Sequence, residues 1–309
     1  MFSNILVPLD GTAQSNAALP LARTIAQATG GTITLLRVVK AGDTTRAAEA
    51  ADELRRIAAE LTTDGAPVKT VVCDSDEIAY AIIKQIHQDP TDLVIMRTHG
   101  RVGIERAVLG SVTQEVLAGS RVPIMLLRPG GRRVSHINKL LVPVDGSAGG
   151  TLALGTAVQL NHATGASIQL LHVSVPASTW IYAGDAYGGM SYYDPAWDEE
   201  ALASARTYVE GVVKRLRAAQ VAVEGEAREA PVVAEAIVQS ANTSNADLIV
   251  MSTRALTGPA RALLGSTADA VVRAAHCPVL LIHRAQAAAD VPYAFQSERT
   301  EMESVATPA

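Results

Sequence analysis

The chain contains an internal duplication, and this repeat constrains its fold more than any other feature of the sequence. An apolar run that ends in an Asp-Gly pair occurs at residues 5–12 and returns 135 positions later at residues 140–147. Another apolar run, at residues 92–96, returns 155 positions later at residues 247–251, so the second copy is longer. Each copy has about 140 residues, a common size for one domain. The expected boundaries are 1–129 and 139–284 for the two domains, 130–138 for an exposed linker, about 176–198 for an insertion and 285–309 for a disordered or extended tail.

Each copy alternates short apolar runs with stretches of helical periodicity. In the first copy, strands are expected at residues 4–8, 32–38, 68–73, 93–96 and 124–127, and helices at residues 15–29, 45–61, 76–88 and 111–118. This alternation predicts an α/β fold with two tandem, doubly wound, Rossmann-like domains. Each domain is expected to contain a five-stranded, mostly parallel sheet with helices on both faces. Ligands of such sheets bind at the carboxyl ends of the strands, where Asp10, Val38 and Gly100 are expected to lie.

A loop with glycines follows the fourth apolar run of each copy. The first copy reads Arg97-Thr98-His99-Gly100, nine residues, then Gly110-Ser111. The second copy reads Ser252-Thr253-Arg254-Ala255, nine residues, then Gly265-Ser266. Glycines allow the backbone to approach a phosphate closely, and the N-terminus of the following helix carries a partial positive charge. Both loops are therefore candidate phosphate-binding sites.

Together with an aspartate after the first strand, these loops resemble the nucleotide motif of the universal stress protein family, Gly-x-x-Gly-x9-Gly-[Ser/Thr]. The resemblance covers both copies, from about residue 4 to 127 and from about residue 139 to 283. The first copy departs from the motif at Arg97, and the second departs from it at Ser252 and Ala255. The resemblance implies an adenine nucleotide hydrolase-like fold that binds ATP, with Mg²⁺ as a companion of the phosphates.

The resemblance also assigns residues to the nucleotide. In domain 1, Asp10 would meet the ribose and the backbone of Val38 would read the adenine edge. Arg97 would lie beside the ribose, and the residues that would line the phosphates are Gly100, Arg101, Gly110, Ser111 and Val112. The corresponding residues of domain 2 are Asp145, Val173, Gly265, Ser266 and Thr267. Because Ala255 adds a Cβ where the backbone would approach phosphate, we hypothesise that domain 1 binds ATP more tightly than domain 2.

Three functions remain open from the residues. The first is a nucleotide-dependent stress or signalling regulator with little or no catalytic turnover, for which no catalytic residue is expected. The second is a slow ATP hydrolase, although the sequence has no Walker A motif and no evident general base. The third is an interaction module that binds no nucleotide.

Several residues also have plain structural interpretations. Asp10 and Asp145 could be helix N-caps. His99 is better explained by a structural hydrogen bond than by a catalytic role. The acidic residues around Asp198 suit a solvated helix start rather than a metal site. His276 and Cys277 alone provide too few ligands for zinc. The Tyr-rich insertion could form a lid, or it could pack as an ordered segment.

Composition excludes some classes of partner and location. The net charge is −5 and no stripe of Lys or Arg stands out, which argues against nucleic-acid binding. The two cysteines, Cys73 and Cys277, suit buried apolar positions better than a disulfide framework. No long apolar run predicts a membrane span, and no signal peptide precedes the first strand. The expected location is therefore the cytoplasm.

The fifth strands, at residues 122–126 and 277–281, would lie at sheet edges. Bare edges invite pairing, and members of the resembling family dimerise through this strand. We expect the two domains to pair with each other within the chain. A homodimer of the whole chain is a further alternative that the sequence leaves open.

Overall fold

The computed structural model describes residues 2–63, 65–98, 109–179, 193–253 and 264–283. The strands are β1 (Asn4–Pro8), β2 (Thr32–Val39), β3 (Val68–Asp74), β4 (Leu93–Arg97), β5 (Ile124–Leu127), β6 (Lys139–Pro143), β7 (Ser167–Ser174), β8 (Val223–Glu229), β9 (Leu248–Thr253) and β10 (Val279–His283). The helices are η1 (Ser15–Ala18), α1 (Leu19–Thr29), α2 (Thr44–Thr63), α3 (Ile78–Gln88), α4 (Ser111–Gly119), α5 (Ala148–Thr164), α7 (Ala196–Ala218), α8 (Val233–Thr243) and α9 (Ser266–Ala274). This order confirms the predicted tandem α/β fold.

Two of the expected helices begin later than predicted. The segment predicted as one helix from residue 15 starts with the 3₁₀ turn η1, and α1 then begins with Pro20 in its first turn. Proline suits a helix start because its missing N–H has no partner there in any case. Helix α3 begins at Ile78 because Ser75 Oγ accepts a hydrogen bond from Glu77 N at 3.1 Å, which holds the preceding residues in a turn.

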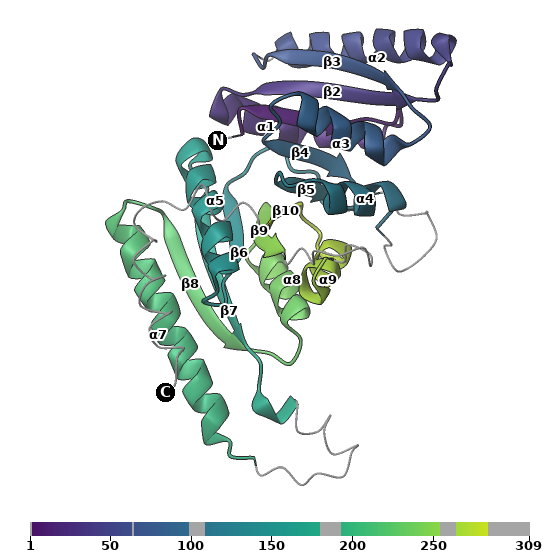
Figure 1. Ribbon diagram of the computed structural model, residues 1–309. Helices are drawn as coiled ribbons and strands as arrows, with labels where there is room; N and C mark the ends of the chain where they lie inside the picture. The colour runs from purple at the N-terminus through teal and green to yellow at the C-terminus, as the bar shows by residue number, and fades with distance from the viewer. Residues whose placement is uncertain (1, 64, 99–108, 180–192, 254–263, 284–309) are drawn as a thin grey trace, which may run out of the picture.

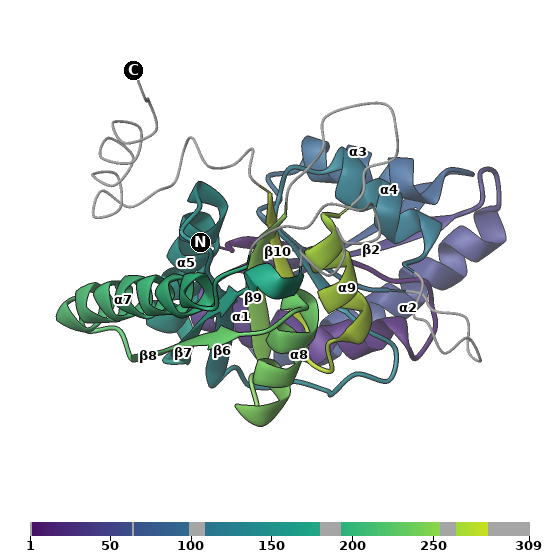
Figure 2. The same cartoon turned by 90° about the horizontal axis from the view of Figure 1, so that it is seen from below.

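All ten strands form one sheet, in the order β3-β2-β1-β4-β5-β10-β9-β6-β7-β8 (Figure 1). The strands of each domain are parallel, and β5 and β10 join the domains as an antiparallel pair in the middle of the sheet. In this pair Leu280 lies opposite Met125. The expected pairing of the two domains within the chain is therefore confirmed. Figure 2 shows α7 of domain 2 and α4 of domain 1 on opposite sides of the molecule.

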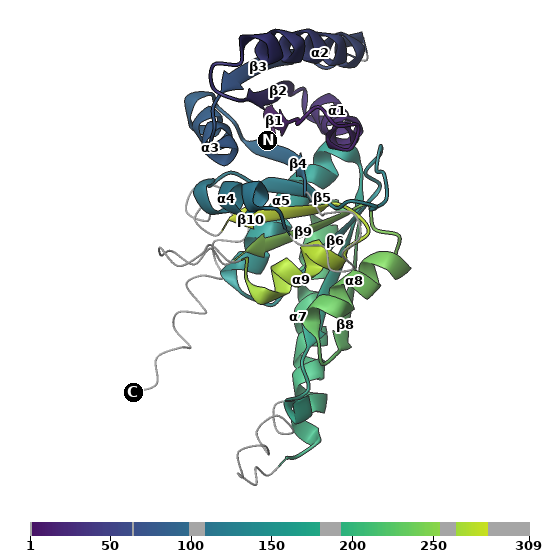
Figure 3. The same cartoon turned by 90° about the vertical axis from the view of Figure 1, so that its right-hand side faces the viewer.

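The core consists of one apolar cluster on each face of the sheet. Successive side chains of β1 alternate between them, with Ile5 and Val7 in one cluster and Leu6 in the other. The first cluster contains residues of α1, α2, α5 and α7, and the second contains residues of α3, α4, α8 and α9. Figure 3 shows α1 and α3 on opposite sides of the strands of domain 1. We refer below to these two sides as the α1 face and the α4 face.

The linker contributes to the core, which corrects the expectation of a simply exposed connection. Val134 and Ile137 are buried in the cluster of the α1 face, which runs through both domains. Their apolar side chains gain more from this burial than they would from contact with water. The linker thus fastens the two domains together.

Both cysteines are free thiols. Cys277 is buried, and this burial raises its pKa to about 11, whereas Cys73 is partly exposed. Among the described residues, no helix is long and apolar enough to cross a membrane.

Candidate functional site

A cleft of about 360 Å³ lies at the carboxyl ends of β6, β7 and β9 in domain 2. All five residues that the sequence assigned to this domain line it: Asp145, Val173, Gly265, Ser266 and Thr267. The parallel sheet brings them together because its strands end at the same edge, where α9 also begins. Their role in binding a ligand stays a prediction.

The cleft has an apolar wall that sequence reasoning did not identify. Leu171 and Val173 lie two positions apart on β7, so their side chains share one face of the strand. Val233 and Ile237 lie four positions apart on α8, which places them on one side of the helix. Met251 at the end of β9 also lines this wall. A flat apolar ring would find dispersion contacts there, beside the polar residues at the start of α9.

The loop after β6 is held by the carboxylate of Asp145. Its Oδ1 accepts hydrogen bonds from the backbone N of Ser147 at 3.0 Å and from the Ser147 hydroxyl at 2.5 Å. The Ser147 hydroxyl in turn accepts from Gly150 N and caps α5. The N-cap of α5 is therefore Ser147, and the simple interpretation of Asp145 as that cap is wrong. A Cβ at Gly150 would lie 3.0 Å from Asp145 Oδ1, so glycine leaves room for this loop.

Domain 1 repeats the same loop. Oδ1 of Asp10 accepts hydrogen bonds from Thr12 N at 2.9 Å and from the Thr12 hydroxyl at 2.7 Å, and that hydroxyl accepts from Ser15 N. The N-cap of η1 is Gln14, so Asp10 is not the cap either. Sequence reasoning missed Thr12 and Ser147, although the repeated Asp-Gly-[Thr/Ser] triplet carried their signal.

The structure places part of the predicted domain 1 site at the equivalent sheet edge. Asp10 follows β1, Val38 lies near the end of β2, and Gly110 precedes Ser111 and Val112 at the start of α4. The predicted residues Gly100 and Arg101 lie outside the described residues, as do His99, Arg254 and Ala255. Arg97 lines a different cleft, between the domains.

The two domains differ beside the repeated Asp loops, at Arg37 and the matching His172. Arg37 is buried and pairs with Glu53 of α2 at 3.0 Å. His172 makes an edge contact with Tyr208 of α7, with ring centroids 5.9 Å apart. Burial lowers the pKa of His172, whereas the Asp145 carboxylate acts in the opposite direction. Nδ1 of His172 is buried and has no hydrogen-bond partner among the described residues.

The lowered pKa of His172 predicts a pH dependence of stability. Below the ordinary histidine pKa of about 6.5, the unfolded chain binds a proton that the folded chain resists, so stability is lost as the pH falls. We expect His172→Phe, which keeps an aromatic ring beside Tyr208, to flatten this part of the stability curve. Urea denaturation between pH 7 and pH 5 measures the effect. An unchanged slope in the variant would assign the pH dependence to other groups.

Asp198, in the first turn of α7, has a structural role at the base of the segment predicted as an insertion. Asp198 accepts hydrogen bonds from Ala177 N at 2.6 Å and from the Tyr193 hydroxyl at 2.5 Å, which raises the pKa of Tyr193. This geometry joins the two ends of the segment predicted as an insertion, where α7 begins. Tyr182, Tyr187 and Tyr192 lie outside the described residues. Within the described part of the chain, no group of three or more His, Cys, Asp or Glu side chains could hold a metal ion.

Comparisons with known proteins agree with this architecture. The sequence profile of the universal stress protein family matches residues 1–128 and 136–283. A universal stress protein of Methanocaldococcus jannaschii is 51% identical over 51 residues, which cover 16% of this chain and 30% of that relative. The Thermus aquaticus universal stress protein of the QAH/OAS sulfhydrylase 3′ region is 33% identical over 148 residues, which cover 46% of this chain and 96% of the relative.

A solved structure shares the fold over nearly the whole chain. The crystal structure of a universal stress protein from Archaeoglobus fulgidus DSM 4304 has a TM-score of 0.69 and 22% sequence identity, and the match covers 92% of this chain and 99% of that one. The matched segments of the family profile coincide with the two halves of the ten-stranded sheet. The chain belongs to the universal stress protein family, and it contains two copies of the family's domain in tandem.

Proposed function

We propose that this protein is an ATP-binding regulator of a stress or signalling response, with little or no catalytic turnover and with Mg²⁺ accompanying the phosphates. The observation that carries the proposal is the cleft of domain 2. It combines an apolar wall, the Asp145 loop and the N-terminus of α9, and it is lined by all five residues that the sequence assigned to the nucleotide in domain 2. Nucleotide occupancy would act by favouring one conformation or partner over another.

The chemistry of the lining suits an adenine nucleotide. The apolar residues of β7 and α8 would contact the base, and the Asp145 carboxylate would accept a hydrogen bond from a ribose hydroxyl. The first N–H groups of α9 have no partners within the helix, and no side chain in the described part of the chain caps them at Gly265. Together with the helix dipole, these groups would bind phosphate oxygens. The first-turn acid Asp269 pairs with Arg273 at 2.7 Å, which offsets its negative charge near this end.

The same lining argues for slow turnover. Among the described residues it contains no histidine and no lysine, and the one carboxylate, that of Asp145, already accepts two hydrogen bonds from Ser147. No residue of the described lining is therefore well placed to activate water as a general base. A phosphate-release assay distinguishes the regulator from a slow ATP hydrolase, because steady release that scales with protein concentration would favour the hydrolase.

Aspartate substitutions at Gly110 and Gly265 test the proposed phosphate sites. Both glycines are N-caps with negative φ, a position that aspartate favours, and a Cβ at Gly265 would meet no atom of the described residues within 4 Å. We expect Gly265→Asp to keep or slightly raise stability, while its negative charge weakens ATP binding to domain 2 by about tenfold or more. Isothermal titration calorimetry measures affinity and stoichiometry.

The matched variant Gly110→Asp tests which of the two domains binds ATP more tightly. If domain 1 binds ATP more tightly, as the hypothesis from Ala255 holds, Gly110→Asp removes the tighter site and Gly265→Asp the weaker one. Equal losses would contradict that order. Mass spectrometry of small molecules released from the denatured wild-type protein completes the test. If no nucleotide is released and ATP gives no heat on titration, the interaction module is the better-supported function.

A further inference from the structure

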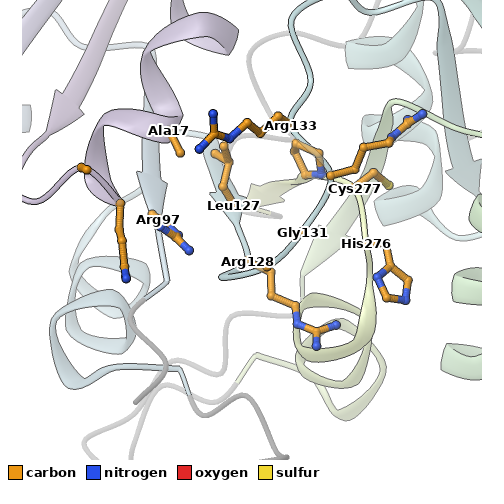
Figure 4. Close-up of a pocket in the computed structure, with 13 residues that line it drawn as sticks. Ala17, Arg97, Leu127, Arg128, Gly131, Arg133, His276 and Cys277 are labelled. Atoms are coloured by element: carbon orange, nitrogen blue, oxygen red, sulfur yellow. The ribbon is translucent and has the colours of Figure 1, made fainter. Parts of the chain in front are cut away.

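A second cleft, of about 300 Å³, lies between the two domains, and its lining contains four arginines. Arg97 enters it from β4, and Arg128, Arg132 and Arg133 come from the linker side. Figure 4 shows Arg97 and His276 on opposite sides of this space. No aspartate or glutamate lines the cleft among the described residues, although the whole chain has a net charge of −5.

This interdomain cleft is separate from the sites proposed for ATP. Side chains alternate along β4, and Ile95 belongs to the core cluster of the α1 face. Arg97 lies two positions later and therefore extends on the same face, where Ala17 of η1 and its N-cap Gln14 also line the cleft. The helix start at Ser111 belongs to α4, which packs on the other face. The cleft thus opens on the side of β4 opposite α4.

The four guanidinium groups differ in how well they are already paired. Arg132 donates to Asp247 Oδ1 at 2.8 Å and to the backbone oxygen of Ala246 at 2.6 Å. Arg128 donates to the backbone oxygen of Ala274 at 3.1 Å. Arg97 and Arg133 have no ion pair or hydrogen bond of their side chains within the described part of the chain. Arg128 and Arg132 are held in place by the protein, whereas Arg97 and Arg133 remain able to bind an anion.

The electrostatic surroundings of Arg97 also favour the binding of an anion. Burial lowers the pKa of its guanidinium, the Asp10 carboxylate acts in the opposite direction, and the charge of Arg133 adds to the lowering. The group stays protonated, because arginine titrates far above neutral pH. Holding it half-buried beside a like charge costs free energy that a bound anion would offset.

We propose that the interdomain cleft binds a small oligophosphate, a ligand with two or three linked phosphate groups. The planar guanidinium fork binds phosphate oxygens in a bidentate way, and two or three linked phosphate groups carry enough oxygens to bind both Arg97 and Arg133, which a single chloride or carboxylate does not. Arg97 belongs to domain 1, whereas His276 belongs to domain 2, so the bound oligophosphate contacts both domains. It therefore stabilises the domain pair as well as filling the cleft.

Titration calorimetry with inorganic tripolyphosphate, in buffer without Mg²⁺, tests this site on the full chain. We expect Arg133→Gln and Arg97→Gln each to weaken tripolyphosphate binding by about tenfold or more. The matched control is Arg121→Gln, which removes an exposed arginine at the opposite end of β5 from Arg128. Arg133 is exposed, so its variant is expected to fold even if Arg97→Gln does not.

Tripolyphosphate could also bind where ATP is proposed to bind, so the titration is repeated in the double variant Gly110→Asp/Gly265→Asp. Retained tripolyphosphate binding in that background, together with unchanged ATP binding in Arg133→Gln, supports a separate site. Complete loss in that background would place the tripolyphosphate in the nucleotide sites and overturn the proposal. It would also be overturned by the absence of binding to the wild type, by equal losses in Arg121→Gln, or by equal affinity for citrate, which would show a general anion patch.

Discussion

Replacing Leu280 with aspartate is expected to lower the free energy of unfolding by more than about 4 kcal/mol, because a charged carboxylate would enter the core without a partner. Leu280 is fully buried in the middle of the antiparallel β5–β10 pair, opposite Met125. Both side chains belong to the apolar cluster that runs through the two domains. The substitution therefore weakens domain 2 and the joint between the domains at once.

Urea denaturation followed by circular dichroism measures the loss, and size-exclusion chromatography shows whether the exposed β5 edge recruits other copies. Leu280→Met is the matched control, since it keeps the volume and apolar character of the side chain and should cost less than about 1.5 kcal/mol. If Leu280→Asp and Leu280→Met unfold at the same urea concentration, the β5–β10 pair does not form the joint described here.

Valine at position 225 is expected to produce the second largest loss of stability, about 2–3 kcal/mol, through overpacking between β8 and α7. A Cβ at Gly225 would overlap Val209 Cγ1 and lie 2.7 Å from Val213 Cγ2, and both valines belong to α7. Both side chains lie on the side of α7 that faces β8, so α7 must move away from the sheet to make room for valine. We expect a lower midpoint of denaturation without loss of the fold.

Domain 1 offers a matched control for this change. Thr70 occupies the equivalent register, opposite Leu35 of β2, as Gly225 lies opposite Leu170 of β7. Thr70 is exposed, so Thr70→Val should change the free energy of unfolding by no more than about 0.5 kcal/mol. Equal effects of the two substitutions in urea denaturation would show that α7 is not packed closely on Gly225.

The fold was readable from the sequence because its main signals are local and occur twice. The apolar runs of each copy became parallel strands. The expected edge position of residues 122–126 and 277–281, together with the family resemblance, predicted the pairing of β5 with β10. Helix starts were less readable. The exact beginning of α3, for example, depends on one hydrogen bond between Glu77 N and Ser75 Oγ, which composition and periodicity do not reveal.

The candidate site was partly readable, for the same reason. Residues at the ends of parallel strands had to meet at one edge, which placed Asp145 near Gly265. The apolar wall was not readable, because Val233 and Ile237 look like ordinary core residues of a helix until α8 is placed against the strands. The role of the linker was also hidden. Val134 and Ile137 are two apolar residues in a polar stretch, and only the packed domains show where they are buried.

The joint between β5 and β10 has a consequence for how the two halves could diverge. Where identical subunits meet about a twofold axis, each substitution appears on both sides of the interface together. Here the two sides of the joint are separate positions of one gene product, so Met125 and Leu280 can differ. The same freedom allows Arg97 in one half while the other half has Ser252 at the matching place. A fused pair can therefore specialise, with each half changing under its own selection while the partner preserves the shared sheet.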